Sequence, residues 1–395
     1  CRVLQKGCAI YLGSTRVRGM NKHLDAVELT TELIRYNTIN PPGKERACAR
    51  YIGRLLEEGG FRVHLHEFAP ERTSLIATMG GDETRPPICF TGHMDTVPLG
   101  SSPWNRAALK GDRDARKVYG RGASDMKSGL AAMIKAAMEL AGGLERSPGV
   151  MLVITAGEET GCEGAKYVAG LNRAMGNAGA LVVGEPTANY PMLGHKGCLW
   201  IEVHTRGVTA HGSMPEKGVN AIYKAARAVT RLEELDFDVQ PDPLLGGPTL
   251  NVGTISGGMN INSVPDKAVL SVDIRTILGQ DHDMLCDRLQ AYLGADAEVV
   301  KVLEAESILT EPENEWIQDT YDLITPFLQE RPHPRTVTYF TDASILTPAL
   351  GGPPTILLGP GEPDMAHKAD EFCHVSRIES ASALYTEIIR KWCGI

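Results

Sequence analysis

The sequence predicts an α/β protein that has a mixed, mostly parallel sheet, helices on both faces of that sheet, and an inserted ferredoxin-like α+β domain. Apolar strand-like runs alternate with helical patterns in the first half of the chain, which is typical of a parallel-rich sheet covered on both faces. From about residue 197 the order becomes strand, helix, strand, strand, helix, strand, the split βαβ order of a ferredoxin-like domain. The length of 395 residues also favours two domains.

The elements of the main sheet follow from the spacing of apolar residues. Before the insert, helical spacing predicts helices over 24–37, 44–59, 126–142 and 165–171. Short apolar runs predict strands over 61–68, 74–80, 86–93, 150–157 and 180–184. After the insert, the α/β pattern resumes with a helix over 313–329, a strand over 354–359 and a closing helix over 378–392.

The insert is predicted to form a sheet of its own. Its strands are expected over 198–207, 249–258, 267–276 and 297–305, and its helices over 218–235 and 282–294. We therefore expect three parts of the chain: a disordered extension over 1–19, one domain built from 20–196 and 304–395, and a second domain over 197–303.

Composition narrows the classes of function. The net charge is −9 and no block is rich in Lys and Arg, which argues against nucleic acid as a partner. No stretch approaches the ~20 consecutive apolar residues that span a bilayer, so a membrane partner is not expected. The nine cysteines are scattered singly without CxxC spacing, which predicts reduced thiols and a cytoplasmic location.

Acidic and imidazole side chains follow three of the predicted strands. His93 follows ICFTG, the adjacent Glu158 and Glu159 follow VMLVITAG, and Glu185 follows ALVVG. Ligands of such sheets lie at the carboxyl ends of the strands, so we expect these side chains in one crevice. Two adjacent carboxylates also allow one to bind a cation while the other moves protons.

Each candidate residue has an ordinary structural alternative. Asp95 accepts the second N–H of the His93 imidazole in the functional interpretation, and the two form a polar turn in the other. Asp125 is a ligand or the N-cap of the helix that follows it. For Glu158-Glu159 the alternative is a solvated loop, and for Glu185 it is a turn that ends the strand. For His367 it is a loop histidine that binds nothing.

Taken jointly, two histidines and several carboxylates form the ligand set of a two-metal hydrolase. Mixed nitrogen and oxygen ligands favour Zn²⁺, with Co²⁺ or Mn²⁺ as alternatives. Cys162, beside the glutamate pair, has no evident basic partner in the sequence, which favours packing over a role as nucleophile.

Five motifs carry a resemblance to a known family. TGHMDTVP, GRGASDMKSG, TAGEETG, GEPT and AHKADEF occur in this order around the insert. They resemble the zinc metallopeptidase family that includes succinyl-diaminopimelate desuccinylase, acetylornithine deacetylase, aminoacylase and glutamate carboxypeptidase, from about Met20 to the C-terminus. HKGCLW, VTAHGSMPEKGVNAI and YFTDAS are most similar to the acetylornithine deacetylase and succinyl-diaminopimelate desuccinylase branch.

The resemblance implies a fold, a metal site and the roles of its residues. The main domain would be a zinc-exopeptidase-like catalytic domain, and the insert a lid and dimerisation domain. Glu158 would be the general base, and Asp95 would orient a ligand histidine. Two divalent metal ions, zinc in the first instance, would be held by His93, Asp125 (shared by both ions), Glu159, Glu185 and His367.

Three residues of the insert receive roles from the same resemblance. His211 would stabilise the tetrahedral oxyanion across a dimer interface, and a surface turn histidine is the alternative. Asn262 and Arg275 would hold the carboxylate of the substrate, and a cross-strand salt bridge is the alternative for Arg275.

These observations predict a cytoplasmic, homodimeric amidohydrolase that removes the acyl group from a small N-acyl amino acid through a water activated by two zinc ions. The substrate would be of the N-acetylornithine or N-succinyl-diaminopimelate type. The desuccinylase pattern has two adjacent Asn, whereas Ile261-Asn262 keeps only the second, which counts against the succinyl substrate. A carboxypeptidase or dipeptidase of the same family, acting on dipeptides, is the first alternative, and a non-catalytic metal-binding relative is the second.

Overall fold

The computed structural model describes residues 24–81, 85–171 and 175–395, so the extension predicted over 1–19 lies outside the described residues. The chain forms two compact units. Unit 1 contains the described residues up to Leu193, together with 310–335 and 341–395. Unit 2 contains 194–309 and 336–340, so it includes the whole of the insert predicted over 197–303.

Unit 1 is built on a six-stranded sheet in the order β1-β2-β6-β3-β7-β14. Parallel pairing joins β6, β3, β7 and β14, whereas β1 and β2 pair antiparallel at one side. This confirms the mixed, mostly parallel sheet. The strands are β1 (Arg62–Ala69), β2 (Arg72–Met79), β3 (Ile88–His93), β6 (Val150–Thr155), β7 (Ala180–Val183) and β14 (Thr355–Leu357).

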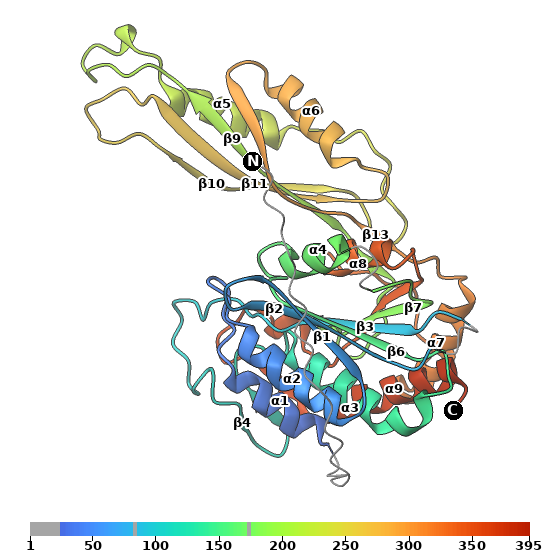
Figure 1. The fold of residues 1–395 in the computed structure, drawn as a ribbon. Helices are drawn as coiled ribbons and strands as arrows, with labels where there is room; N and C mark the ends of the chain where they lie inside the picture. The colour runs from blue at the N-terminus through green and yellow to red at the C-terminus, as the bar shows by residue number, and fades with distance from the viewer. Residues whose placement is uncertain (1–23, 82–84, 172–174) are drawn as a thin grey trace, which may run out of the picture. The chain divides into compact units, whose positions relative to one another are not determined.

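Burial explains the sequence pattern of the central strands. Every residue of β3, β6 and β7 is buried, because helices cover both faces of a parallel sheet and leave no face for polar side chains. In Figure 1, α1, α2, α3 and α9 lie below this sheet, and α4 and α8 lie above it. The helices are α1 (Ala26–Arg35), α2 (Arg46–Glu58), α3 (Lys127–Leu144), α4 (Glu163–Gly170), α7 (Glu315–Leu328), α8 (Ala343–Ala349) and α9 (Val375–Cys393).

Some short elements of unit 1 were not predicted from the sequence. These are α8 and a three-stranded sheet in the order β15-β5-β4. The strands have only two or three residues and α8 has seven with Pro348 inside it, so none of them is long enough to show a periodic pattern. The strands are β4 (Asp112–Arg113), β5 (Lys117–Tyr119) and β15 (Phe372–His374).

Unit 2 is a four-stranded antiparallel sheet in the order β10-β11-β9-β12. With one helix after β9 and another after β11, this is the ferredoxin-like arrangement that the sequence predicts. Side chains of β11 alternate between buried and partly buried, as expected for a sheet with one face against helices. The elements are β9 (Gly197–Arg206), α5 (Ala221–Glu233), β10 (Thr249–Gly257), β11 (Lys267–Thr276), α6 (His282–Leu293) and β12 (Ala297–Ala305).

A small pairing extends unit 2 beyond the predicted insert. β8 (Gly194–His195) pairs with β13 (Ile308–Leu309), and His195 also bridges Val337. This pairing explains why 336–340 belongs to unit 2. Across the ranges 24–81, 85–171 and 175–395, no helix is long and apolar enough to cross a membrane.

Candidate metal centre

The candidate site forms where the central strands of unit 1 end. His93 is the last residue of β3, Glu158 and Glu159 follow β6, and Glu185 follows β7. These strands are parallel neighbours in the sheet, so their carboxyl ends meet, as expected for a ligand site in an α/β protein.

A close approach of helix and strand brings Asp125 to the same place. A Cβ atom added to Gly129 on α3 would lie 2.1 Å from the carbonyl oxygen of Gly184, which follows β7. Only glycine permits this contact, and it holds the start of α3 against the strand ends. Asp125 lies two residues before the helix, and its side chain therefore faces His93.

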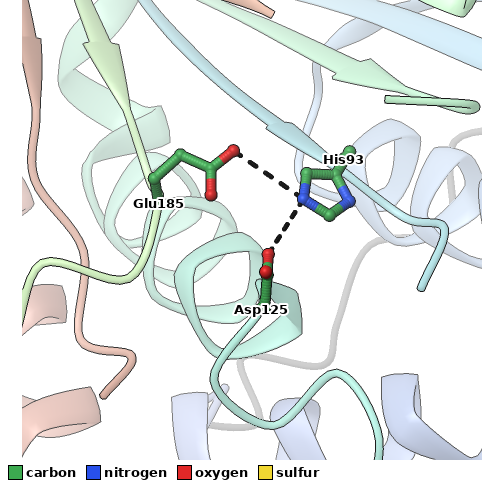
Figure 2. A group of neighbouring side chains, drawn as sticks. All are labelled: His93, Asp125 and Glu185. Atoms are coloured by element: carbon green, nitrogen blue, oxygen red, sulfur yellow. Dashed lines mark hydrogen bonds and ion pairs between the residues drawn. The ribbon is translucent and has the colours of Figure 1, made fainter. Parts of the chain in front are cut away.

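The first group of possible metal donors is His93, Asp125 and Glu185. Nε2 of His93 lies 3.1 Å from Oδ1 of Asp125 and 3.7 Å from Oε1 of Glu185. Figure 2 shows both carboxylates pointing at the same imidazole nitrogen. The donor atoms of the three residues lie within 4.8 Å of one another, which is close enough to share one ion.

The second group is Asp125, Glu159 and His367, again with donor atoms within 4.8 Å of one another. Nε2 of His367 lies 3.4 Å from Oδ2 of Asp125 and 3.3 Å from Oε2 of Glu159. The two oxygens of Asp125 therefore face different histidines, one in each group. In the described part of the chain no side chain caps α3, and the N-cap position is Met126, so Asp125 does not act as the helix cap.

Glu158 belongs to neither group of donors, although it lies beside them. It is only 6% exposed. The carboxylate of Asp95 holds its loop, because Oδ1 accepts hydrogen bonds from the backbone N–H groups of Gly157 (2.9 Å) and Glu158 (3.1 Å), and Oδ2 from that of Glu159 (3.2 Å). The Asp95 carboxylate thus holds the backbone of the glutamate pair in place.

Asp95 also contacts His93, but mainly through a different oxygen than the sequence suggests. Nδ1 of His93 lies 3.0 Å from the main-chain carbonyl oxygen of Asp95 and 3.6 Å from its carboxylate. The loop amides occupy the carboxylate, which leaves the carbonyl as the nearer partner. Either contact favours a proton on Nδ1, which keeps Nε2 free to bind a cation.

The site holds several buried carboxyl groups whose negative charges a cation would stabilise. Burial, and then the charge of Asp125, raises the pKa of Glu159 to about 7. Burial also raises the pKa of Glu158 and of Glu185 well above the ordinary value. Hydrogen bonds to Asp125 and Glu159 raise the pKa of His367 to about 10. Without a cation, these carboxyl groups can only be stabilised by bound protons.

The donor set fits divalent ions. Oε1 of Glu159 is buried and has no hydrogen-bond partner among the described residues, and an orphaned buried carboxylate oxygen is costly unless something binds it. Each group offers one imidazole nitrogen and two carboxylates, a mixture suited to Zn²⁺, Co²⁺ or Mn²⁺.

The three candidate residues of the insert lie in unit 2. Nδ1 of His211 accepts hydrogen bonds from Oγ (2.7 Å) and the backbone N–H (3.2 Å) of Ser213, which keeps the ring proton on Nε2. Asn262 lies near His211, because its carbonyl oxygen accepts a hydrogen bond from the backbone N–H of Gly212. The Asn262 residue is exposed.

Arg275 forms a salt bridge, as in its structural alternative, but within one strand and not between two strands. Its guanidinium pairs with Asp273 of the same strand, with Nε and Nη2 each 3.0 Å from a carboxylate oxygen. Nη1 is buried and has no hydrogen-bond partner within the described ranges. One nitrogen of the guanidinium therefore has hydrogen-bonding capacity that the described residues do not use.

Two residues near the site received no role from the sequence. Asn40 donates to Oδ2 of Asp95 (2.9 Å) and to Thr160 (2.8 Å), so it braces the same loop. Asp342 is buried and accepts a hydrogen bond from Thr155, and burial raises its pKa to about 6. Its motif, YFTDAS, was visible as a resemblance, but a single Asp before a short helix carries no metal-site pattern.

Cys162 is a buried free thiol whose pKa is raised by burial.

The sequence is similar to proteins of a known family. Residues 89–391 match the model of peptidase family M20/M25/M40. An acetylornithine deacetylase from Myxococcus xanthus is 30% identical, over 95% of this chain and 100% of that protein. A probable succinyl-diaminopimelate desuccinylase from Staphylococcus epidermidis is 27% identical, over 93% of this chain and 98% of that protein.

Solved structures share the fold. An M20 family metallo-carboxypeptidase from Sulfolobus solfataricus superposes with a TM-score of 0.79 at 17% identity, over 94% of this chain and 99% of that chain. A dinuclear metal binding peptidase from Bacillus subtilis superposes with a TM-score of 0.69 at 15% identity, over 93% of this chain and 98% of that chain.

Fold, site and relatives together define a hydrolase that acts on amide bonds. The chain belongs to peptidase family M20/M25/M40.

Proposed function

We propose that the chain is a metal-dependent deacylase that hydrolyses the amide bond of a small N-acyl amino acid. The observation that carries this proposal is the pair of donor groups that share Asp125, with the buried Glu158 beside them and outside both. The names of the relatives that are 27% and 30% identical over nearly the whole chain support a deacylase. The solved structures named as peptidases are less than 25% identical and support only the fold.

Two divalent ions, which we propose to be zinc, would be held by the two donor groups. One would be bound by His93, Asp125 and Glu185, and the other by Asp125, Glu159 and His367. When bound, such ions supply Lewis acidity to a carbonyl oxygen and make water a nucleophile at neutral pH.

Glu158 would carry the proton in this reaction. Its carboxylate takes a proton from the attacking water, and then returns that proton to the leaving nitrogen as the C–N bond breaks. The products are a carboxylate and a free amine, so atoms and charge balance. The hydrogen bonds from the loop amides to Asp95 keep Glu158 in position, and its burial keeps bulk water away from it.

Unit 2 would supply the remaining polar contacts and the dimer interface. The ring proton on Nε2 of His211 is suited to stabilise the oxyanion of the tetrahedral intermediate, and Asn262 and Arg275 are suited to bind the carboxylate of the substrate. β10 is an edge strand, and exposed apolar side chains lie on it or near it. A second copy of the chain would cover this surface, formed by Tyr223, Ile255, Met259 and Ile261.

A substrate panel tests the proposal. Purified protein with added zinc or cobalt is assayed on N-acetyl amino acids, N-succinyl amino acids and dipeptides, and Glu158→Gln prepared identically controls for contaminating hydrolases. We expect a higher kcat/KM on acyl amino acids than on dipeptides. Hydrolysis of dipeptides alone would favour the peptidase alternative, and no hydrolysis of any compound by metal-loaded protein would favour the non-catalytic one.

A further inference from the structure

A buried ion pair joins the two segments that carry Asp125 and His367. Arg121 and Glu371 are 1% and 0% exposed, and Nη1 of Arg121 lies 2.7 Å from Oε2 of Glu371. They belong to the motifs GRGASDM and AHKADEF, but neither is among the possible metal donors. Their other contacts indicate what they do.

Glu371 holds the main chain that leads to Asp125. Its Oε1 accepts hydrogen bonds from the backbone N–H groups of Ser124 (2.8 Å) and Asp125 (3.0 Å), and its Oε2 accepts one from Gly122 (3.0 Å). With Arg121, four donors surround one carboxylate, which leaves it little freedom. The backbone of the residue shared by both donor groups is therefore fixed by Glu371.

Arg121 holds the loop of His367. Its Nη2 donates to the carbonyl oxygens of Pro98 (3.0 Å) and His367 (3.4 Å), and its Nη1 donates to that of Lys368 (3.3 Å). His367 has a φ of +64°, a left-handed conformation that residues other than glycine adopt only when their surroundings impose it. The hydrogen bonds from Arg121 are suited to impose it.

The two donor groups do not depend on this pair equally. His93 and Glu185 are positioned by β3 and β7, whose residues are all buried. His367 lies in the loop before β15 and is 56% exposed at its side chain, so it lacks support from the sheet. Loss of the pair should therefore disturb the second group, which contains His367, more than the first.

We propose that Arg121 and Glu371 are positioning residues that set the affinity for the ion held by Asp125, Glu159 and His367. This inference rests on the proposed two-ion function. Residues that orient metal ligands typically change metal affinity by about 10- to 100-fold when they are replaced. We expect a loss of this size for the second ion and a smaller loss for the ion held by His93, Asp125 and Glu185.

Zinc titration of the metal-free protein tests this without an activity assay. The wild type, Glu371→Gln and Arg121→Lys are titrated by calorimetry and by competition with a chelating dye, and bound zinc is counted after equilibration at fixed free zinc. The wild type should bind two ions. At a free zinc level that just saturates the wild type, both variants should keep most of the first ion, whose affinity falls less, and lose most of the second.

Glu45→Gln is the matched control. Glu45 is also 0% exposed and is paired with an arginine, Arg72, at 3.0 Å, but its side chain does not hold the segments of Asp125 or His367. This variant should lose thermal stability and still bind two ions with the affinities of the wild type. The control separates the loss of a buried ion pair from the loss of metal positioning.

The outcomes distinguish the two proposals. A wild type that binds fewer than two ions would remove the proposed function and this inference with it. If the wild type binds two ions, an unchanged second affinity in both variants, or an equal fall in both affinities, overturns the inference alone. Arg121→Lys keeps the buried charge, so it is the test if Glu371→Gln does not fold; failure of both to fold would assign the pair to the fold instead.

Discussion

Replacement of Glu158 by Gln separates proton transfer from metal binding. Glutamine keeps the shape of the side chain, and Glu158 is not among the donor residues of either group, so both ions should remain bound. Loss of a general base usually lowers kcat by about 10²- to 10⁴-fold, equivalent to about 2.7 to 5.4 kcal/mol in the barrier. KM should change little, since the substrate carboxylate and acyl group keep their contacts.

The structure also predicts how this variant affects folding. Burial raises the pKa of Glu158 well above 4.5, so the ionised carboxylate destabilises the metal-free protein at any pH above the unfolded value. Glutamine removes that cost. Metal-free Glu158→Gln should therefore unfold with a free energy at least equal to that of the wild type at about pH 8.

Steady-state kinetics, zinc content and urea unfolding of the same preparations check these expectations. Turnover of Glu158→Gln at nearly the wild-type rate would show that another group moves the proton. Loss of an ion from the variant would show that Glu158 is a ligand.

Two further predictions concern pH and the second unit. A group whose pKa is raised by folding contributes stability that is lost as pH rises from its unfolded to its folded pKa. The free energy of unfolding of metal-free protein should therefore fall between about pH 4.5 and 7 through Glu159, and between about pH 6.5 and 10 through His367. Urea unfolding at several pH values measures this, and a rise over these ranges would contradict it. His211→Ala should reduce kcat without reducing the thermal stability of unit 2. If His211 acts across the interface, dimers mixed from His211→Ala and Glu158→Gln chains should regain activity. Mixtures that stay inactive after subunit exchange would exclude that role.

Long, regular patterns made the main elements predictable from the sequence. The mostly apolar runs of β3, β6 and β7 and the alternation of β11 reflect burial on two faces or one, and burial is what periodicity records. That His93, Glu158, Glu159 and Glu185 lie close together was also predictable, because strand-end positions in a parallel sheet converge whatever the loops do. Asp125 and His367 directly follow no strand of that sheet, and only the resemblance to a family pointed to them.

Contacts made by the main chain were not predictable. No residue pattern reveals that the carboxylates of Asp95 and Glu371 accept backbone N–H groups, or that Arg121 donates to the carbonyl of His367. Such contacts depend on loop conformations that bring distant segments together. The contacts of Asn40 with Asp95 and of Asp342 with Thr155 were missed for the same reason.

Anomalous X-ray diffraction at the zinc edge, from crystals grown with zinc, tests the central claim most directly. We expect two strong peaks, one among His93, Asp125 and Glu185 and the other among Asp125, Glu159 and His367, with Asp125 contacting both. A single peak, or peaks that Asp125 does not contact, would contradict the two-ion site.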